Sequence, residues 1–415
     1  MSKKTPPVWV PSDLRENPLP YPVWGEAHID PEARKQMDNA MRLPISVAGA
    51  LMPDAHVGYG LPIGGVLATE NAVIPYAVGV DIACRMRITI FPQSANMIGQ
   101  KAAQFKNALM EQTRFGAGAR FASTDQVEHE ILEDEDWKAT KFLASLKDTA
   151  FAQLGTSGTG NHFVEWGELT LEQPSPDLEL KAGSYLALLS HSGSRGVGFK
   201  IANHYSELAR IMRPDLDKSV QHLAWFDLNS HEGQEYWLSM QLAGRFAAAN
   251  HEVIHKRIAK AMGLKPAASV ENHHNFAWKE TIPAPPGFDG PDRTVIVHRK
   301  GATPAGEGVL GIIPGSMGDA GYVVRGLGKS EGLYSASHGA GRAMSRRQAL
   351  NTITKTERDK YLKARGVTLL GGGMDESPQA YKPIQAIIES QLDLVEIIGK
   401  FSPRVVRMAD DPGDI

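Results

Sequence analysis

The sequence predicts an α+β fold, a single large domain with mixed or antiparallel sheets, glycine-rich loops and surrounding helices. Helical and strand-like patterns are grouped along the chain and do not alternate strictly, which disfavours a doubly wound sheet. The sequence has no internal repeat and no linker long enough to separate domains. Its 415 residues include 41 glycines and 26 prolines, so many positions should lie in turns.

The first elements follow from local signals. Residues 1–25 are rich in proline and predict an extended arm. A helix is expected from Pro31 to about residue 41, because Ile29 and Asp30 supply a hydrophobic staple and an N-cap. Between residues 51 and 90, short apolar runs broken by glycines indicate buried strands joined by tight turns.

The middle of the chain combines an acidic segment with a long helix. Residues 123–136 predict a solvated or mobile surface insertion, because seven acidic residues and no lysine or arginine fall between residues 125 and 136. Apolar residues at helical spacing predict a helix from about residue 232 to residue 262, with Gly263 as its stop.

Towards the C-terminus, residues 282–292 predict a loop, and a strand is expected over residues 294–298. Helices are expected over about 342–350, 356–365 and 380–398. Residues 409–415 form an acidic tail.

Charge and cysteine content limit the functional classes. A formal net charge of -3 excludes a generally basic protein that coats nucleic acid. A local basic groove is still compatible with it, since residues 292–347 contain eight lysines and arginines against four acids. Cys84 is the single cysteine, so no intrachain disulfide can form. With no signal-peptide pattern and no apolar run of membrane length, we expect a cytoplasmic protein without a membrane partner.

Four segments place a metal-ligating or nucleophilic side chain among glycines or small residues. Each residue taken alone is better explained as a structural one, but together a thiol, a carboxylate and several imidazoles favour a transition-metal site of manganese, iron, cobalt or zinc. The spacing matches no zinc finger, so distant segments would have to assemble the site. The four segments are Asp81-Ile-Ala-Cys84, which is expected to end a buried strand, Asn161-His162 after Gly155-Thr-Ser-Gly-Thr-Gly160, His191-Ser-Gly-Ser-Arg195-Gly196 and His338-Gly-Ala-Gly-Arg342.

A second theme is anion binding. Arg195 and Arg342 lie in glycine-rich turns and are candidates for RNA or phosphate contacts. Arg342, Arg346 and Arg347 lie near the expected start of the helix after His338, where free N–H groups would favour phosphate. For Arg346 and Arg347, a merely solubilising role is at least as well supported. No P-loop signature occurs.

Longer strings carry a resemblance to a known family. The sequence resembles the RtcB family of GTP-dependent RNA ligases, and the matching strings follow the order of that family from about residue 50 to residue 397. They are Met52-Pro-Asp-Ala-His-Val-Gly-Tyr-Gly-Leu-Pro-Ile-Gly-Gly-Val66, Ala77-Val-Gly-Val-Asp-Ile-Ala-Cys84, Gly158-Thr-Gly-Asn-His-Phe-Val-Glu165, His191-Ser-Gly-Ser-Arg-Gly196, His273-His-Asn275, Ile313-Pro-Gly-Ser-Met-Gly318, Ser337-His-Gly-Ala-Gly-Arg-Ala-Met-Ser-Arg346, Asp375-Glu-Ser-Pro-Gln-Ala-Tyr-Lys382 and Gln391-Leu-Asp-Leu-Val-Glu396.

The resemblance implies two Mn²⁺ ions and GTP as cofactors. Cys84 would bridge the ions, Asp81 and His162 would complete one shell, and His191 and His274 the other. His338 would be the nucleophile that takes GMP from GTP. The residues that would hold the guanylate are Asn161, Glu165, Asn275, Pro314, Gly315, Ser316, Met317, Gly339, Ala340, Gly341 and, as a stand-in for a C-terminal lysine of the family, Arg407.

The implied activity joins an RNA 3′-phosphate or 2′,3′-cyclic phosphate to a 5′-hydroxyl, for RNA repair or tRNA splicing, with an archease-type activator as a further partner to consider. Two alternatives stay open: a two-metal phosphoesterase or 3′-end guanylyltransferase that does not seal, and an inactive RNA-binding paralogue. The chain also departs from the family around Cys84, where Ala83 and Arg85 replace glycines, and at Gly321, where a serine is common. Arg85 is expected to bring charge and bulk near the metal ions.

Overall fold

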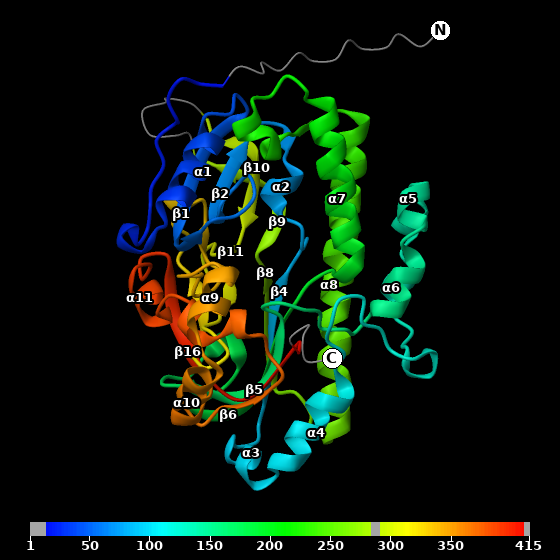
Figure 1. Cartoon of the computed structure of the whole chain (residues 1–415), viewed down its shortest axis with the longest axis vertical. Coiled ribbons are helices and arrows are strands. Elements are labelled where there is room, and N and C mark those ends of the chain that lie inside the picture. The colour runs from blue at the N-terminus through cyan, green and yellow to red at the C-terminus, as the bar shows by residue number, and fades with distance from the viewer. Residues whose placement is uncertain (1–13, 284–290, 411–415) are drawn as a thin grey trace.

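A strongly curled sheet forms the centre of the computed structural model, which describes residues 14–283 and 291–410 (Figure 1). Neighbouring strands within this sheet are antiparallel, except that one short strand pairs in parallel with its neighbour. The two edge strands come together where the Ile312 N–H donates to Asn272 Oδ1 over 2.9 Å, so the sheet nearly closes on itself. The order is β12 (Leu310–Ile313), β13 (Gly321–Gly326), β16 (Val395–Met408), β5 (Phe163–Leu171), β6 (Gly183–Ser192), β4 (Arg85–Phe91) and β8 (Ala268–His273), and β15 (Thr368–Leu370) pairs in parallel with β16.

Alternation along these strands separates two cores. Ile88 and Leu189 point into the space that the curled sheet encloses. Trp166 and Leu188 point outward and pack against helices, where Phe105 contacts the Trp166 ring at a centroid distance of 5.0 Å. Because successive side chains of a strand face opposite ways, a residue's position along its strand decides which core it joins.

Long helices cover the outer face of the sheet. α8 (His231–Met262) and α4 (Ala102–Gln112) pack against it, and α7 (Arg195–Met212) lies beside α8 (Figure 1). Ser230 caps α8, and Gly263 ends it with a left-handed φ of 64°. The predicted helix over residues 232–262 is therefore confirmed.

A second sheet lies against one end of the first. It contains β1 (Ser46–His56), β2 (Ile63–Thr69), β10 (Arg293–Lys300) and β9 (Asn275–Ile282), in that order. α1 (Pro31–Met41) packs against β1 and starts as predicted, with Asp30 accepting from the Glu32 N–H. Two-stranded ladders join β11 (Ala302–Pro304) with β14 (Ser335–Ser337), and β3 (Ala72–Val73) with β7 (Phe226–Asp227).

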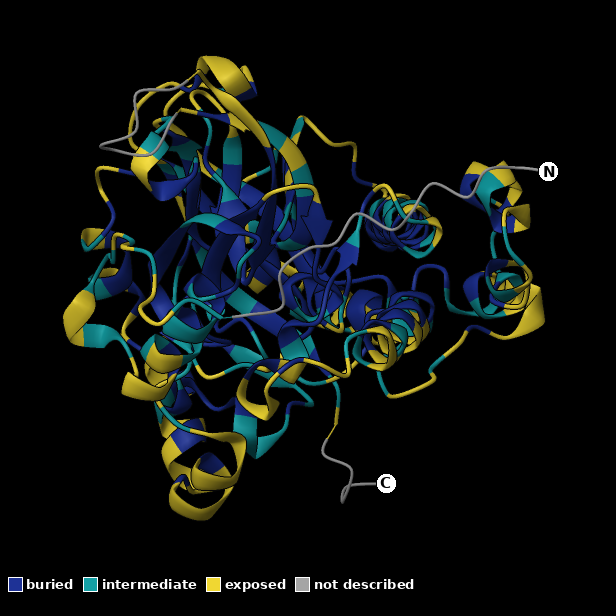
Figure 2. Ribbon diagram, turned by 90° about the horizontal axis from the view of Figure 1, so that it is seen from above, coloured by how far each residue is buried: buried dark blue, intermediate teal, exposed yellow. Residues whose placement is uncertain are grey.

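Most of the shorter helices lie at the periphery, where the exposed surface concentrates (Figure 2), whereas α2 is buried against α7 and β10. No helix of the described residues is both long and apolar enough to cross a lipid bilayer. The α-helices are α2 (Pro75–Val78), α3 (Asn96–Gln100), α5 (Lys141–Ala144), α6 (Lys147–Gln153), α9 (Arg346–Thr352), α10 (Lys355–Ala364) and α11 (Ile384–Glu389). The 3-10 helices are η1 (Glu26–His28), η2 (Ser123–Asp125), η3 (Glu130–Glu133), η4 (Glu135–Lys138), η5 (Pro176–Leu178), η6 (Lys218–Leu223), η7 (Ser330–Gly332), η8 (Met374–Glu376) and η9 (Pro378–Ala380).

The architecture confirms the α+β prediction, but three local predictions are wrong. The helix expected over residues 380–398 is only α11, because the β-branched residues after it pair with β13 as part of β16. The helix expected from residue 342 begins at Arg346, where Ser345 caps it. The Asp81–Cys84 segment is a turn before β4 and does not end a strand, since Pro75 starts α2 and Ala83 has a φ of 56°.

Other parts of the sequence prediction fall partly outside the described residues. In the proline-rich arm, residues 1–13 are outside, and Val23 forms a bridge to Leu51 of β1. The expected loop 282–292 contains the undescribed residues 284–290, and residues 411–415 of the acidic tail are also outside. In the acidic segment, Ile131 and Leu132 are buried, while Asp134 and Asp136 bind Arg245 of α8.

Candidate functional site

Four strand ends meet at one end of the curled sheet. Arg85, the first residue of β4, lies opposite both Ser192 of β6 and His273 of β8. Phe163, the first residue of β5, lies opposite His191. Residues at these ends are therefore brought together although they come from four distant parts of the chain.

The five metal ligands predicted from the resemblance lie next to one another there. His162 Nε2 is 2.9 Å from Asp81 Oδ2 and 3.4 Å from Cys84 Sγ. On the other side, Cys84 Sγ is 3.1 Å from His191 Nε2, which is 3.3 Å from His274 Nε2. The thiol thus stands in the middle of the row, with a carboxylate and an imidazole on one side and two imidazoles on the other.

Backbone carbonyls orient two of the imidazoles. His162 Nδ1 lies 3.0 Å from the Ser157 carbonyl oxygen, and His191 Nδ1 lies 3.1 Å from that of Asn161. A carbonyl only accepts, so Nδ1 carries a proton in both rings, and Nε2 is the ring atom that faces the other donors of the cluster. This is the usual arrangement of metal-ligating histidines. One thiolate, one carboxylate and three imidazoles therefore fit one or two transition-metal ions better than magnesium or calcium.

Burial opposes the charged forms of the Cys84 thiol, the His191 imidazole and the Asp81 carboxylate. Burial and the Asp81 carboxylate raise the pKa of the Cys84 thiol well above its usual value. Burial lowers the pKa of His191 to about 3. Burial also opposes ionisation of Asp81, but the hydrogen bond and charge of His162 and the charge of Arg195 outweigh it and lower the Asp81 pKa to about 2. A bound divalent ion would reverse the balance at the thiol, because it stabilises the thiolate directly.

Two glycines are required by this packing. A Cβ atom on Gly193 would lie 2.2 Å from Asp81 Oδ1. A Cβ on Gly158, which has a φ of 103°, would lie 2.5 Å from both His162 Nδ1 and the Arg195 guanidinium. Asn250 of α8 secures the same loop, since its side chain accepts from the Gly155 N–H over 2.7 Å and donates to the Thr156 carbonyl over 3.0 Å.

The cluster opens into a pocket of about 790 Å³, a size typical of small-molecule sites. It is bounded by the ends of the curled sheet, the second sheet and the turn after β12. Most of the residues predicted to hold the guanylate line it: Asn161, Asn275, Pro314, Gly315, Ser316, Met317, Gly339, Ala340 and Gly341.

His338 lines this pocket immediately after β14. Its Nδ1 atom is 2.7 Å from Oδ2 of the buried Asp54, which also accepts from the backbone N–H of His338 over 3.1 Å. The ring lies 4.9 Å from that of His274, measured between centroids. Because Nδ1 donates to the carboxylate, Nε2 carries a free lone pair, and it has no hydrogen-bond partner among the described residues.

Arginines and acidic residues form one side of the pocket. Arg342 donates to the Met344 carbonyl, to Glu376 and to the Asp375 carbonyl. Arg346 pairs with Asp375 and with the buried Glu376. Arg195 lies on the far side of His162, with its Nη1 atom 3.4 Å from His162 Nδ1, and does not line the pocket itself.

Two residues predicted for the guanylate are not among the pocket-lining side chains. Glu165 is buried inside the curled sheet, where its Oε2 atom has no partner among the described residues and burial raises its pKa well above the usual value. Arg407 donates to the Leu370 carbonyl and pairs with Asp410, while its neighbour Met408 lines the pocket.

Arg85 does not reach the metal cluster, contrary to the sequence expectation. Its side chain points to the outer face of the sheet, donating to Glu271 over 3.2 Å and to the Gly244 carbonyl of α8 over 3.3 Å. Cys84 and Arg85 are successive residues at a strand start, so they face opposite cores.

Sequence reasoning gave no role to Asp54 or Lys300, and it did not favour a site role for Arg346. Lys300 is buried at the pocket edge, donates to the Tyr59 carbonyl, and has a pKa lowered by burial to about 7. One feature of the sequence could have indicated a role for both residues. Asp54 and Lys300 are ionisable residues next to apolar residues and glycines, where burial is expected.

Fold and site together define a class of protein: an α+β protein whose buried Cys/His/Asp cluster forms the floor of a nucleotide-sized pocket containing an oriented histidine. The family described as tRNA-splicing ligase RtcB matches residues 36–409, and the chain belongs to this family. It is 30% identical to the RNA-splicing ligase RtcB of Escherichia coli K12, over 91% of this chain and 95% of that protein. It is 31% identical to the RNA-splicing ligase RtcB of Mycobacterium tuberculosis (86% and 95%) and 28% identical to the tRNA-splicing ligase RtcB of Methanococcus maripaludis (87% and 88%).

Proposed function

We propose that this protein is a cytoplasmic, GTP- and manganese-dependent RNA ligase. It would join an RNA 3′-phosphate to an RNA 5′-hydroxyl, with a 2′,3′-cyclic phosphate first hydrolysed to the 3′-phosphate. The names of the relatives support an RNA-joining activity. The observation that carries the mechanism is His338, whose Nδ1 is held by Asp54 beside the five-donor cluster.

In the first step, His338 Nε2 attacks the α-phosphorus of GTP. An N–P bond forms, the bridging bond between the α-phosphorus and its leaving oxygen breaks, and pyrophosphate departs. The Nδ1 proton stays on the ring, where the Asp54 carboxylate stabilises the positive charge that develops.

In the second step, an oxygen of the RNA 3′-phosphate attacks the same phosphorus and the N–P bond breaks. His338 is regenerated and the RNA carries a 3′-pp-guanosine end. The RNA 5′-hydroxyl then gives its proton to solvent and attacks the phosphorus of the original 3′-phosphate. The new phosphodiester bond forms as the phosphoanhydride bond breaks, and GMP departs.

The residues present suit the manganese that this scheme requires. The two ions would be held by Cys84, by Asp81 and His162 on one side of it, and by His191 and His274 on the other. Bound there, two divalent ions would neutralise phosphate oxygens and align the reacting groups. A thiolate ligand favours manganese over magnesium.

Labelling with GTP tests the proposal directly. Wild-type protein with Mn²⁺ and α-³²P-GTP should acquire an acid-labile label, and His338→Ala should abolish it. His231→Ala, at an exposed position at the start of α8, should label like the wild type. Full labelling of His338→Ala would refute the assignment of the nucleophile.

Product analysis separates sealing from capping. Given RNA with 3′-phosphate and 5′-hydroxyl ends, the wild type should form a longer, joined RNA. Accumulation of a 3′-guanylylated RNA that is never sealed would instead identify a guanylyltransferase. Addition of an archease-type protein should raise the number of turnovers without changing the product.

A further inference from the structure

A second hollow lies beside the pocket, between α10 and the segment that contains β15 and η8. It encloses about 770 Å³. Arg358 spans its base, where its Nη1 donates to the Gly372 carbonyl over 3.1 Å. Lys355 and Lys363 line it from α10, and Met374 of η8 lines it from the opposite wall. We refer to this hollow as the α10 groove.

The segment that contains α9 and α10 is basic in an acidic protein. Residues 346–365 contain seven lysines and arginines against two acidic residues, whereas the whole chain has a formal net charge of -3. Asp359 is the one carboxylate among the described residues that line the groove, and Arg358 binds it over 3.0 Å. Lys355 and Lys363 are exposed and form no ion pair with any described residue, so their charges face solvent.

Two elements connect the groove with the proposed catalytic pocket. η8 contributes Met374 to the groove and Glu376 to the pocket. α10 packs on the turn that follows β12, since the Tyr361 hydroxyl donates to Asp319 over 2.6 Å and a Cβ on Gly318 would lie 2.8 Å from Leu362. A chain leaving the pocket over η8 would therefore enter the groove.

The lining indicates what kind of partner fits. None of the described residues that line the groove is aromatic, so they offer no stacking platform for bases. It does offer two free ammonium groups, which suit a row of phosphates. A protein partner would be expected to bury an apolar centre, but Leu362 and Val367 are already covered.

We propose that the α10 groove holds the phosphodiester backbone of the RNA substrate, several nucleotides away from the end that reacts, without reading base sequence. This inference rests on the proposed function. It adds a substrate-binding surface outside the pocket, formed by Lys355 and Lys363 from α10.

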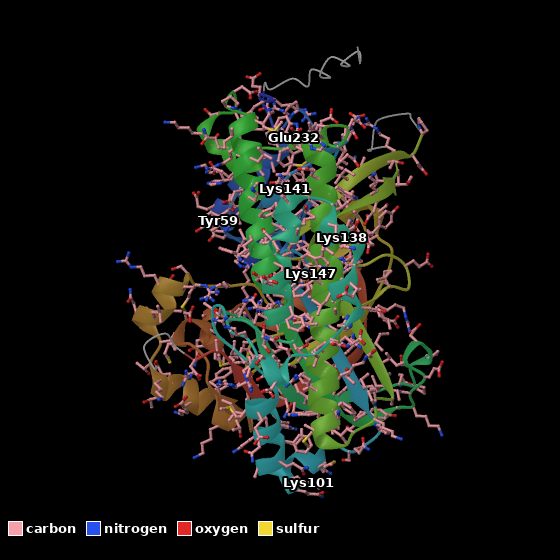
Figure 3. The ribbon with its side chains drawn as sticks, turned by 90° about the vertical axis from the view of Figure 1, so that its right-hand side faces the viewer. Tyr59, Lys101, Lys138, Lys141, Lys147 and Glu232 are labelled. Atoms are coloured by element: carbon pink, nitrogen blue, oxygen red, sulfur yellow. The ribbon has the colours of Figure 1, made fainter. Side chains whose placement is uncertain are left out.

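The test compares neutralised lysines in the groove with lysines on another face. The variant Lys355→Gln/Lys363→Gln should bind a 20-nucleotide RNA 3′-phosphate about tenfold more weakly at low salt. The slope of log affinity against log salt concentration should fall by about 1 to 2, since each lost phosphate contact contributes about 0.7 to 0.9. A control, Lys101→Gln/Lys141→Gln, removes two exposed lysines from the side shown in Figure 3 and should change neither quantity.

Two further measurements keep this proposal separate from the proposed function. Labelling by GTP involves no RNA, so both variants should be labelled like the wild type, and absence of label in the wild type would refute the ligase and leave the RNA-affinity test valid. Joining of trinucleotide substrates should be unaffected, because they end before the groove. If the groove variant loses label, the charge-conserving variant Lys355→Arg/Lys363→Arg replaces it in the test. That variant should keep both the label and the RNA affinity of the wild type.

Equal RNA affinity and salt slope in the groove variant and the wild type would overturn the proposal. So would an equal loss in the control variant, which would indicate the overall field of the protein and not the groove. Displacement of RNA by a low concentration of an acidic polypeptide would also overturn it, in favour of a protein partner.

Discussion

His338 Nδ1 lies 2.7 Å from Asp54 Oδ2, although 284 residues separate them in the chain. The carboxylate also accepts from the backbone N–H groups of His338 and of Gly339, over 3.1 and 3.4 Å. Asp54 therefore fixes both the ring and the backbone of the proposed nucleophile. Near it, the buried Lys382 ammonium donates to the carbonyls of Pro53 and Ala55, which places a positive charge beside the buried carboxylate.

Asp54→Asn should slow histidine guanylylation by about 10² to 10⁴-fold, because an amide of the same shape holds the wrong tautomer and cannot stabilise a positively charged ring. The rate of label incorporation from α-³²P-GTP measures this. Asp292→Asn, at an exposed position, is the matched control. A variant of Asp54 that labels at the wild-type rate would show that the carboxylate is only structural.

His274→Gln should lose bound manganese, whereas His273→Gln should keep it. The two residues are neighbours, but His274 lies in the ligand row and His273 packs against Phe276 and Trp278. Metal analysis of the purified variants decides the matter. Equal metal content in the two would be inconsistent with the proposed ligand set.

Arg85→Met should lower the free energy of unfolding by about 1–3 kcal/mol, because it removes the hydrogen bonds that the buried Arg85 guanidinium donates to Glu271 and to the Gly244 carbonyl. Metal content and guanylylation should stay close to wild type, since the side chain lies on the outer face of the sheet. Chemical denaturation and metal analysis check the two halves. A stable variant that had lost its metal would instead place Arg85 within the metal site.

Burial in the second sheet lowers the pKa of His298 to about 4. Its ring accepts from the Ile74 N–H over 2.9 Å and lies 3.2 Å from the Leu67 carbonyl, which suits a neutral imidazole. The unfolded chain takes up this proton near pH 6.5, so between pH 6.5 and pH 4 the unfolded state binds more protons. The stability that His298 contributes is therefore complete above pH 6.5 and decreases as the pH falls.

Urea unfolding at several pH values tests this sign. His298→Gln should reduce the slope of unfolding free energy against pH by up to about 1.4 kcal/mol per pH unit in that window. An unchanged slope in His298→Gln would mean that the histidine is already protonated in the folded protein.

Local signals predicted the elements that depend on local physics. The cap at Asp30, the stop at Gly263 and the strand around residue 296 follow from backbone propensities and side-chain periodicity. The segment after residue 390 could not be predicted in this way. Its apolar residues fit a helix as well as a strand, and pairing with β13 on one side and β5 on the other decided between them.

The candidate site could also be predicted only in part from the sequence. The ligand set could be named because its strings are long and follow the family's order, and the structure places all five donor atoms in one row. The partners of Asp54 and Arg85 could not be predicted from the matching sequence strings. Asp54 is close to His338 only because β1 and the residues after β14 pack together, and Arg85 is kept from the cluster only by the alternation of β4.

The sequence by itself determined which chemical groups this protein has and which glycines allow them to approach, because residue identity and backbone freedom are properties of the chain. Only the tertiary structure decided how charges are paired. It joins Asp54 to His338, assigns Arg85 to Glu271, ties Arg346 to Glu376, and leaves Lys355 and Lys363 unpaired in the α10 groove. The physical reason is that pairing depends on distances of a few ångströms between segments far apart in sequence, and packing of whole elements sets those distances.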